Sequence, residues 1–208
     1  MTETRDRILA CACDLYLSDG LDGFSMRKLA RAVGVTAPAL YRHYENREHL
    51  LLEIVGEAYK LFSQYLHLAL SGEDPVERFR IAGEAYLSFA LEHPRYYEIL
   101  YSYTQYLGLE ELPEEIQALA GAIHQFWLDR VRECMDAGFL KQDDPEMVGR
   151  TFWALSHGYV SIHQRGMLDL DEDGLREAVG ASMRRILEGM GMGLEAEEAE
   201  PTEAAASE

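Results

Sequence analysis

The sequence has few basic residues, few cysteines and no long apolar run, and each shortage excludes a class of protein. Its 208 residues include 19 Lys and Arg against 37 Asp and Glu, which gives a net charge of -18. No apolar stretch approaches the roughly 18 residues that a membrane span needs, and the first residues lack the apolar core of a secretory signal. There are only three cysteines, Cys11, Cys13 and Cys134. A disulfide framework normally has a larger and even number of cysteines, so none is expected here. We therefore expect a cytoplasmic protein with no membrane partner.

The distribution of charge along the chain changes what the acidic total implies. A polyanion repels nucleic acid, so a net charge of -18 by itself argues against DNA binding. Residues 1–60, however, carry a net charge of only -1, and residues 61–208 carry -17. Within the first part, residues 24–47 hold five bases and a single acid, Glu45. One basic segment near the N-terminus is therefore left to attract a phosphate backbone.

Hydrophobic periodicity is helical throughout the chain, and strand-like alternation and hairpin dipeptides are absent. Capping residues, prolines and glycines divide the chain into about nine helices. The expected helices cover approximately residues 4–18, 26–33, 37–44, 46–70, 75–92, 94–106, 113–137, 144–166 and 171–190. The sequence thus predicts an all-α protein in which a three-helix N-terminal domain is joined by a long fourth helix to a C-terminal helical bundle.

These boundaries divide the chain into three parts. Residues 1–50 form the N-terminal domain, and residues 51–190 form the larger C-terminal domain. Residues 191–208 are rich in Glu and Ala, and from Glu188 to the end there are seven Glu and no base. Such a composition cannot build a packed core, so we expect an acidic, disordered tail.

Residues 25–44 contain two short helices joined by a tight turn at Gly34 and Val35. An inner face would be formed by Leu29, Ala30, Val33, Leu40 and Tyr44. This pattern is typical of a helix-turn-helix, in which the second helix enters the major groove of DNA. The alternative is a three-helix packing unit with a solvated basic face. The basic segment coincides with the turn, which favours DNA binding.

The candidate DNA-binding residues lie on and around the second of these helices. Its leading end and outer face would meet base edges, and the Tyr41 hydroxyl would bind a phosphate. Bases on the flanking helices would contact the DNA backbone. The predicted set is Arg27, Lys28, Thr36, Ala37, Pro38, Ala39, Tyr41, Arg42, His43 and Arg47.

The N-terminal quarter of the chain resembles the DNA-binding domain of the TetR family of transcriptional regulators. The matching segments within residues 4–53 are Ile8-Leu9, Ala12, Gly20–Met26, Leu29-Ala30, Gly34-Val35, Leu40–Tyr44 and Asn46–Leu51. The resemblance implies that Tyr41 and Arg47 hold phosphates and that residues 36–43 read an operator. Arg47 stands where the family usually has Lys, and Tyr44 where Phe is common. Arg still binds phosphate, in a bidentate way, and Tyr still fills an apolar site.

The C-terminal part resembles the ligand-binding and dimerisation domain of the same family. Phe152–Gly158, with His93–Tyr97 upstream, resembles a subgroup marked by a Trp…His-Gly signature. A bundle that buries many Tyr and Trp can enclose an apolar pocket with a few polar anchors. The predicted lining is Tyr65, Tyr86, Phe89, Leu100, Tyr103, Phe126, Trp127, Trp153 and His157. Core packing is the alternative for each ring, and a hydrogen-bonded core position is the alternative for His157. Arg95 or Arg130 would either receive an anionic head group or form a surface ion pair.

Two apolar stripes near the C-terminus predict self-association. They comprise Phe152, Leu155, Tyr159 and Ile162 on one helix and Leu175, Val179, Met183 and Ile186 on the next. Two such helices from each subunit would form a four-helix interface about a two-fold axis. The alternative is that both stripes pack inside the monomer. A homodimer also suits DNA reading, because one short helix meets too few bases and paired half-sites supply specificity.

Motifs of common enzymes are not found: the sequence has no P-loop, no HExxH and no Cys/His cluster with zinc spacing. We therefore expect no enzyme activity, no catalytic residue, no metal and no cofactor. The predicted function is a ligand-responsive transcriptional regulator, a homodimeric repressor that leaves its double-stranded operator DNA when a small hydrophobic or amphipathic effector binds. Coupling would run through the fourth helix. The alternative is a small-molecule-binding protein or enzyme with a vestigial helix-turn-helix domain.

Overall fold

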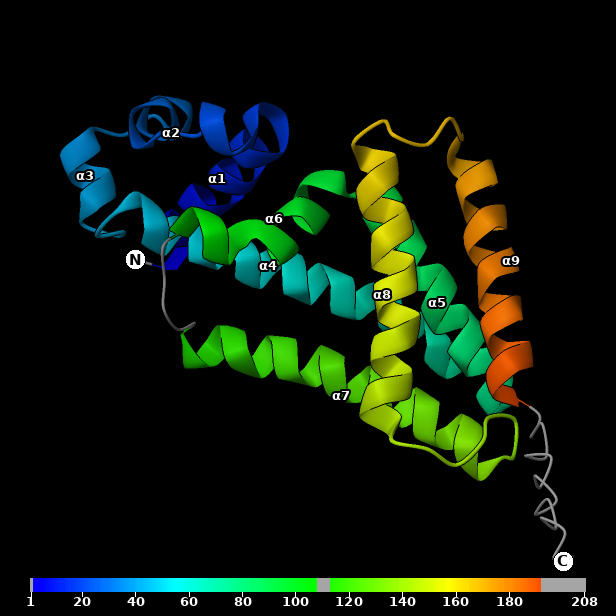
Figure 1. The fold of residues 1–208 in the computed structure, drawn as a ribbon. Coiled ribbons are helices and arrows are strands. Elements are labelled where there is room, and N and C mark those ends of the chain that lie inside the picture. The colour runs from blue at the N-terminus through cyan, green and yellow to red at the C-terminus, as the bar shows by residue number, and fades with distance from the viewer. Residues whose placement is uncertain (1, 108–112, 192–208) are drawn as a thin grey trace, which may run out of the picture.

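The computed structural model describes residues 2–107 and 113–191, with side chains for residues 4–101 and 113–189. Over these ranges the chain is all-α, with nine α-helices and one short 3-10 helix and no strand (Figure 1). The elements are α1 (Thr2–Gly23), α2 (Met26–Val33), α3 (Ala37–Tyr41), α4 (Arg47–His67), η1 (Leu68–Ser71), α5 (Pro75–Glu92), α6 (Pro94–Leu107), α7 (Glu114–Asp136), α8 (Pro145–Gln164) and α9 (Glu172–Gly191). None of the described helices is long and apolar enough to span a bilayer. Residues 192–208, nearly all of the predicted tail, lie outside the described residues.

Side-chain caps begin two of the longer helices, as expected where capping residues precede a helical pattern. The Asn46 side chain accepts a hydrogen bond from the backbone N–H of His49 at 2.7 Å and begins α4. Asp74 accepts one from the N–H of Glu77 at 2.8 Å and begins α5. The Glu77 carboxylate in turn accepts the N–H of Glu73 at 2.8 Å, which completes a reciprocal cap. These bonds satisfy donors that have no partner inside the helix.

The first helix runs further than the predicted end at Ser18. α1 continues to Gly23, but Gly20 has a φ of 68° and interrupts the helical geometry, so a kink separates the last turn. A Cβ atom at Gly20 would lie 2.6 Å from Nη1 of Arg95 in α6. The positive φ favours glycine here, whereas the Arg95 side chain could move to make room for a Cβ atom.

The third helix is shorter than predicted, because it ends at Tyr41 and not at Tyr44. The N–H groups of His43 and Tyr44 both bond to the carbonyl of Leu40, at 2.9 and 3.1 Å, which closes a turn. This turn buries Tyr44 completely. The Tyr44 hydroxyl donates to Glu53 of α4 at 2.8 Å, which fixes the junction between α3 and α4.

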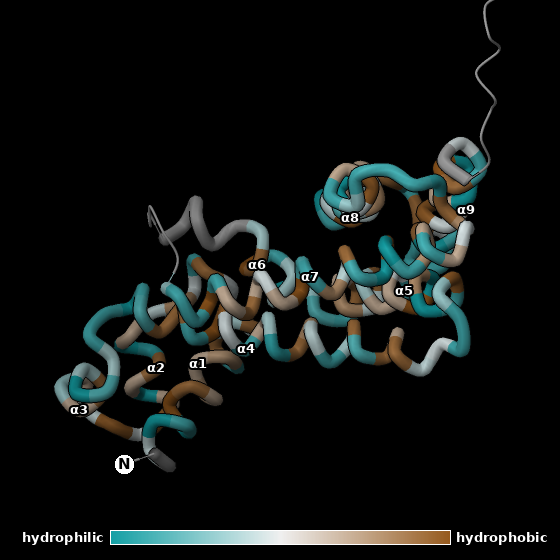
Figure 2. Tube along the Cα trace, turned by 90° about the horizontal axis from the view of Figure 1, so that it is seen from below, coloured by the Kyte–Doolittle hydropathy of each residue, from teal (hydrophilic) through white to brown (hydrophobic). Residues whose placement is uncertain are grey.

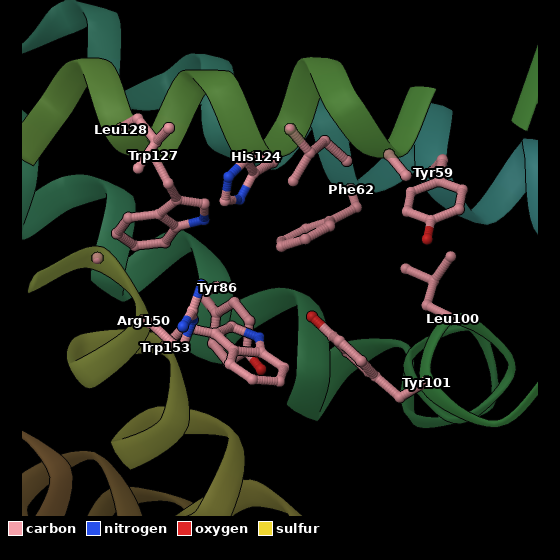
Figure 3. Close-up of a pocket in the computed structure, with 13 residues that line it drawn as sticks. Tyr59, Phe62, Tyr86, Leu100, Tyr101, His124, Trp127, Leu128, Arg150 and Trp153 are labelled. Atoms are coloured by element: carbon pink, nitrogen blue, oxygen red, sulfur yellow. The ribbon is translucent and has the colours of Figure 1, made fainter. Parts of the chain in front are cut away.

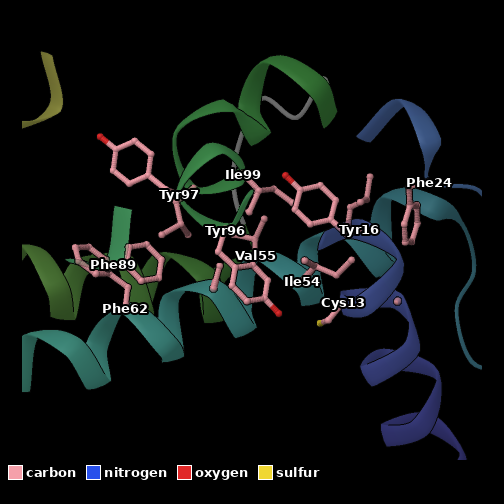
Figure 4. Close-up of a cluster of buried hydrophobic side chains, with 14 of the residues drawn as sticks. Cys13, Tyr16, Phe24, Ile54, Val55, Phe62, Phe89, Tyr96, Tyr97 and Ile99 are labelled. Atoms are coloured by element: carbon pink, nitrogen blue, oxygen red, sulfur yellow. The ribbon is translucent and has the colours of Figure 1, made fainter. Parts of the chain in front are cut away.

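The helix-turn-helix and the last two helices lie at opposite ends of the molecule. Figures 1 and 2 place α2 and α3 at one end and α8 and α9 at the other, with α4 running between them. One hydrophobic core extends along this axis, from Cys13 and Phe24 near α1 to Phe62 and Phe89 in the body (Figure 4). The core is continuous across residue 50, so packing alone sets no break at the domain boundary predicted there.

Candidate DNA-binding surface and internal cavity

α2 and α3 meet at a tight turn centred on Gly34. This residue has a φ of 78° and a ψ of 32°, a left-handed conformation that favours glycine. The N–H of Val35 bonds to the carbonyl of Ala30 at 2.9 Å, which caps α2. Leu29 and Leu40, one from each helix, are completely buried. The pair therefore packs through the predicted inner face and has helix-turn-helix geometry.

The residues predicted to bind DNA lie on the outside of this unit. Exposed members are Arg27, Lys28, Thr36, Ala37, Pro38, Tyr41 and Arg42, and half-buried members are Ala39, His43 and Arg47. The Thr36 hydroxyl accepts the N–H of Ala39 at 3.3 Å, so this side chain caps α3. The structure thus brings the predicted residues to one end of the molecule, where α3 protrudes (Figure 1).

Three arginines on this surface are free to bind phosphate. Arg27, Arg31 and Arg42 are exposed and form no ion pair with any residue that the structure describes. Arg31 is absent from the predicted set. Its spacing of four residues from Arg27, which places both on one face of α2, is the signal that would have identified it.

Two other predicted contacts are engaged within the protein. Lys28 Nζ lies 3.2 Å from the carboxylate of Asp19 and 2.9 Å from the carbonyl oxygen of Gly23. The hydrogen bond from Lys28 lowers the pKa of Asp19. Arg47 donates to the carbonyl of Leu21 at 2.7 Å, from the start of α4 back to the end of α1. Both cations have internal partners, and a phosphate would have to share or replace them.

A cavity of about 350 Å³ lies among α4, α5, α6, α7 and α8 (Figure 3). Its walls are mostly aromatic and aliphatic, and its volume falls within the range of small-molecule sites. The lining residues are Tyr59, Phe62, Tyr86, Leu100, Tyr101, Ala120, Ile123, His124, Trp127, Leu128, Gly149, Arg150 and Trp153.

Four predicted pocket residues line this cavity: Tyr86, Leu100, Trp127 and Trp153. Three others do not. Phe89 is completely buried and stacks on Phe62 with ring centroids 4.6 Å apart. Tyr65 donates to Glu92 at 2.6 Å, and Phe126 packs beneath the guanidinium of Arg130 at 4.6 Å. The side chain of Tyr103 lies outside the described ones.

His157 is half-buried and hydrogen-bonded, and it lines the polar groove between α6 and α8, which is separate from the apolar cavity. Its Nδ1 lies 2.6 Å from the Tyr97 hydroxyl, which lies 2.8 Å from the Tyr86 hydroxyl. Burial, and then the charge of Arg165, lower the pKa of His157. Burial also raises the pKa of Tyr86 and Tyr97, so both phenols stay protonated. The chain of bonds ties α5, α6 and α8 together beside the cavity.

The two arginines considered as anion receptors are placed elsewhere. Arg130 is buried and paired with Glu133, with Nη2 2.6 Å from Oε1. Arg95 lies 3.5 Å from Glu98 and lines a separate, polar groove between α6 and α8. The arginine that does line the apolar cavity is Arg150, which sequence reasoning missed. Helical periodicity shows which face of a helix is buried, but not which part of it the neighbouring helices leave uncovered.

The predicted dimer stripes pack largely inside the subunit. Phe152, Leu175 and Val179 are at most 2% exposed, so the prediction that they contact a partner is wrong. The Tyr159 hydroxyl lies 2.9 Å from that of Ser182, and this contact joins α8 to α9. Leu155, Met183 and Ile186 are half-buried, and Ile162 alone of the eight is exposed. Apart from Ile162, both stripes therefore pack wholly or partly against the interior of the subunit.

Sequence comparison places both parts of the chain in known families. Residues 8–54 match the bacterial regulatory proteins of the tetR family, and residues 79–190 match the Tetracyclin repressor-like C-terminal domain. The HTH-type transcriptional repressor KstR2 of Mycolicibacterium smegmatis is 24% identical over 151 residues, which cover 70% of this chain and 72% of KstR2.

Two solved structures share the fold over most of the chain. A protein of unknown function from Rhodococcus sp. RHA1 has a TM-score of 0.80 at 26% identity, covering 91% of this chain and 96% of that one. AibR, in complex with isovaleryl coenzyme A and operator DNA, has a TM-score of 0.65 at 22% identity, covering 86% of this chain and 97% of AibR. With the C-terminal match alone spanning more than half of the sequence, the chain belongs to the TetR family of transcriptional regulators.

Proposed function

We propose that this protein is a homodimeric repressor that binds operator DNA through α2 and α3 and is released when an effector enters the apolar cavity. The observation that carries the proposal is the group of three exposed arginines, Arg27, Arg31 and Arg42, which have no ion pair among the described residues of a strongly acidic chain. They lie on a helix-turn-helix, where phosphate contacts set the position of the recognition helix. The protein acts in the cytoplasm by binding, without catalysis.

The dimer partner would pack on the outward faces of α8 and α9. The inner faces are occupied by the core, and on the outer side of the C-terminal half of α8 Ile162 is 37% exposed. Gly158, one turn earlier on the same face, allows close approach of another helix. An interface there would be isologous, and it would leave α3 of each subunit free at the opposite end of the molecule.

Two helices connect the cavity to the DNA-binding unit. α4 begins beneath α3 at Arg47 and contributes Tyr59 and Phe62 to the cavity. α6 contributes Leu100 and Tyr101, and near its start the carbonyl of Arg95 accepts the Tyr16 hydroxyl of α1 at 3.0 Å. An effector that moves either helix would change the spacing of the two recognition helices. The coupling is a population shift between a DNA-binding and a released dimer.

Operator binding tests the proposal directly. Fluorescence anisotropy with DNA from upstream of the protein's own gene should show tight, sequence-dependent binding that weakens steeply with salt. Arg42→Ala removes a cation with no internal partner, so we expect weaker binding without loss of fold. Arg47→Ala also breaks the bond to Leu21, and its effect includes a structural part.

A matched control replaces an arginine outside the DNA-binding surface. Arg80 of α5 is exposed and pairs only with Glu84 on its own helix, with Nη1 3.7 Å from Oε1. Arg80→Ala should leave operator affinity unchanged. Equal affinity of Arg42→Ala and the unmodified protein, or binding that does not depend on DNA sequence, would refute the proposed interface.

A further inference from the structure

We propose that the effector is an apolar carboxylic acid, bound as its anion, whose carboxylate pairs with Arg150 at the mouth of the cavity while its hydrocarbon or aryl part fills the interior. This inference rests on the proposed function and names the chemical class of the molecule that the cavity takes. It is carried by the placement of one unpaired cation, by the absence of an acid among the lining residues, and by the apolar character of the remaining wall.

Arg150 is held without a carboxylate partner. It lies on α8 beside Trp153 at one side of the cavity (Figure 3). Glu146, one helical turn earlier, is the acid that an exposed arginine at this spacing would ordinarily meet. Glu146 instead binds His124 of α7, with Oε1 3.1 Å from Nε2. The Arg150 guanidinium forms no ion pair or hydrogen bond with another described residue. Its N–H groups are therefore available to bind a carboxylate.

The charge around the cavity favours an anion. Arg150 is the one Lys or Arg among the lining residues, and none of them is Asp or Glu. Glu146 lies nearby, and its Oε1 is 3.1 Å from Nε2 of His124 on α7. Because Arg150 is exposed, the ion pair would form at the rim, where the carboxylate keeps part of its hydration. A charge held there avoids the large cost of full burial.

The interior fits the apolar part of the molecule. Phe62, Leu100, Trp127 and Trp153 are among the apolar residues of the wall, and the hydroxyl of Tyr101 points into the space (Figure 3). Burial raises the pKa of Tyr101, so its hydroxyl remains a neutral donor. At about 350 Å³ the cavity is near the lower limit for small-molecule sites, which suits a medium alkyl chain or one aromatic ring. A large polar head group would have to remain outside.

The test compares acids with neutral molecules of the same shape. Purified full-length protein is titrated with pairs of compounds that differ only at the head group: straight-chain acids of four to twelve carbons and aryl-alkanoic acids, each beside its primary amide. Binding is followed by calorimetry and by the rise in melting temperature. We expect at least one acid to bind tenfold or more tightly than its amide, and to release operator DNA.

Substitution of Arg150 tests whether its side chain binds the carboxylate. Arg150→Gln should weaken binding of the preferred acid at least tenfold while changing the affinity for its amide less than twofold, and Arg150→Lys should restore part of the loss. The control is Arg132→Gln, which removes an exposed arginine that pairs with Asp129 on α7 at 3.2 Å and lines none of the cavities described above. That variant should bind the acid as the unmodified protein does.

The outcomes separate this inference from the proposed function. In one pair of outcomes, the protein binds its operator tightly but is released by amides, or by coenzyme A thioesters and no free acid. Either result would refute the assignment of the effector as an acid and would leave the proposed repressor function intact. An acid preference that survives Arg150→Gln would overturn the role of Arg150. Failure of every acid to bind would also refute the inference. Acid binding by a protein that does not bind DNA would refute the repressor and support the ligand class.

Discussion

Gly34 is the residue on which the turn between α2 and α3 depends. Its φ of 78° is unfavourable for any residue with a Cβ atom, yet no neighbouring atom lies within 4 Å of where that Cβ would be. The effect of Gly34→Ala therefore comes from the backbone alone. We expect it to lower the free energy of unfolding by about 1–2 kcal/mol, measured by urea denaturation at a fixed protein concentration.

Gly121 provides the matched control for this prediction. It lies within α7, and a Cβ atom there would likewise have no neighbouring atom within 4 Å, but its backbone is helical. Gly121→Ala should raise the free energy of unfolding by up to about 1 kcal/mol. If the two substitutions change stability in the same direction, the left-handed conformation of Gly34 is not what distinguishes them.

The lowered pKa of His157 makes the free energy of unfolding decrease at acidic pH. Its pKa in the folded state lies below the ordinary value of 6.5, because burial and then Arg165 disfavour the charged ring. The unfolded chain therefore binds the proton more readily, and stability falls as the pH drops below about 6.5 until the folded pKa is reached. Above about pH 6.5 the ring is neutral in both states, and this loss of stability is absent.

The substitution His157→Gln should flatten this part of the pH profile. Urea denaturation at pH values from 7.5 to 5 would show a smaller loss of stability in the variant than in the unmodified protein. The seven histidines of the chain all contribute to the profile, so the difference between the two proteins is the informative quantity. Two parallel profiles would mean that His157 titrates equally in the folded and unfolded states.

At the scale of the elements, α8 separates the interior from the surface proposed for dimerisation. Phe152 faces inward and is 2% exposed, whereas Ile162 faces outward. Phe152→Ala should destabilise the subunit by about 3–5 kcal/mol, because a large side chain leaves a cavity in the core. Ile162→Glu should leave the fold of the subunit intact and weaken association instead.

Analytical ultracentrifugation combined with circular dichroism distinguishes these two effects. We expect Ile162→Glu to shift the protein toward monomer at concentrations where the unmodified chain is dimeric, with its helical content unchanged. A variant that remains a dimer of unchanged affinity would place the interface elsewhere than on the outward face of α8.

At the scale of the whole molecule, charge restricts where DNA can bind. The body of the protein is strongly acidic, and the proposed phosphate-binding group is the set of exposed arginines Arg27, Arg31 and Arg42. Replacing Arg27 and Arg31 with Ala should reduce the slope of log affinity against log salt by about 0.9 for each phosphate contact removed. Operator titrations at several salt concentrations give this slope.

An arginine of the body serves as control for the salt experiment. Arg80 is exposed on α5, a helix that lies away from α2 and α3 (Figure 1), and pairs with Glu84 on its own helix. Arg80→Ala also makes the net charge of the chain more negative, and it should leave the slope unchanged. A slope that responds equally to both substitutions would indicate a general effect of net charge and not contacts at the helix-turn-helix.

Local sequence determined the elements of this protein. Caps such as Asn46 and Asp74, and the glycine at position 34, act within a few residues of the helix ends that they set, so their effects can be predicted from neighbours in the chain. The basic segment of residues 24–47 likewise predicted which side chains would be exposed at the proposed DNA-binding surface, because side chains that face outward on two short helices are exposed whatever the rest of the fold does.

Only the tertiary structure decided which apolar faces meet each other, which face a cavity and which are left for a partner. The stripes through Phe152 on α8 and Val179 on α9 are equally suited to a core or to an interface, and packing inside the subunit made both residues core. In the same way, the pairing of Glu146 with His124 across two helices left Arg150 unpaired at the cavity. Such contacts join residues distant in sequence, and periodicity along one helix contains no information about them.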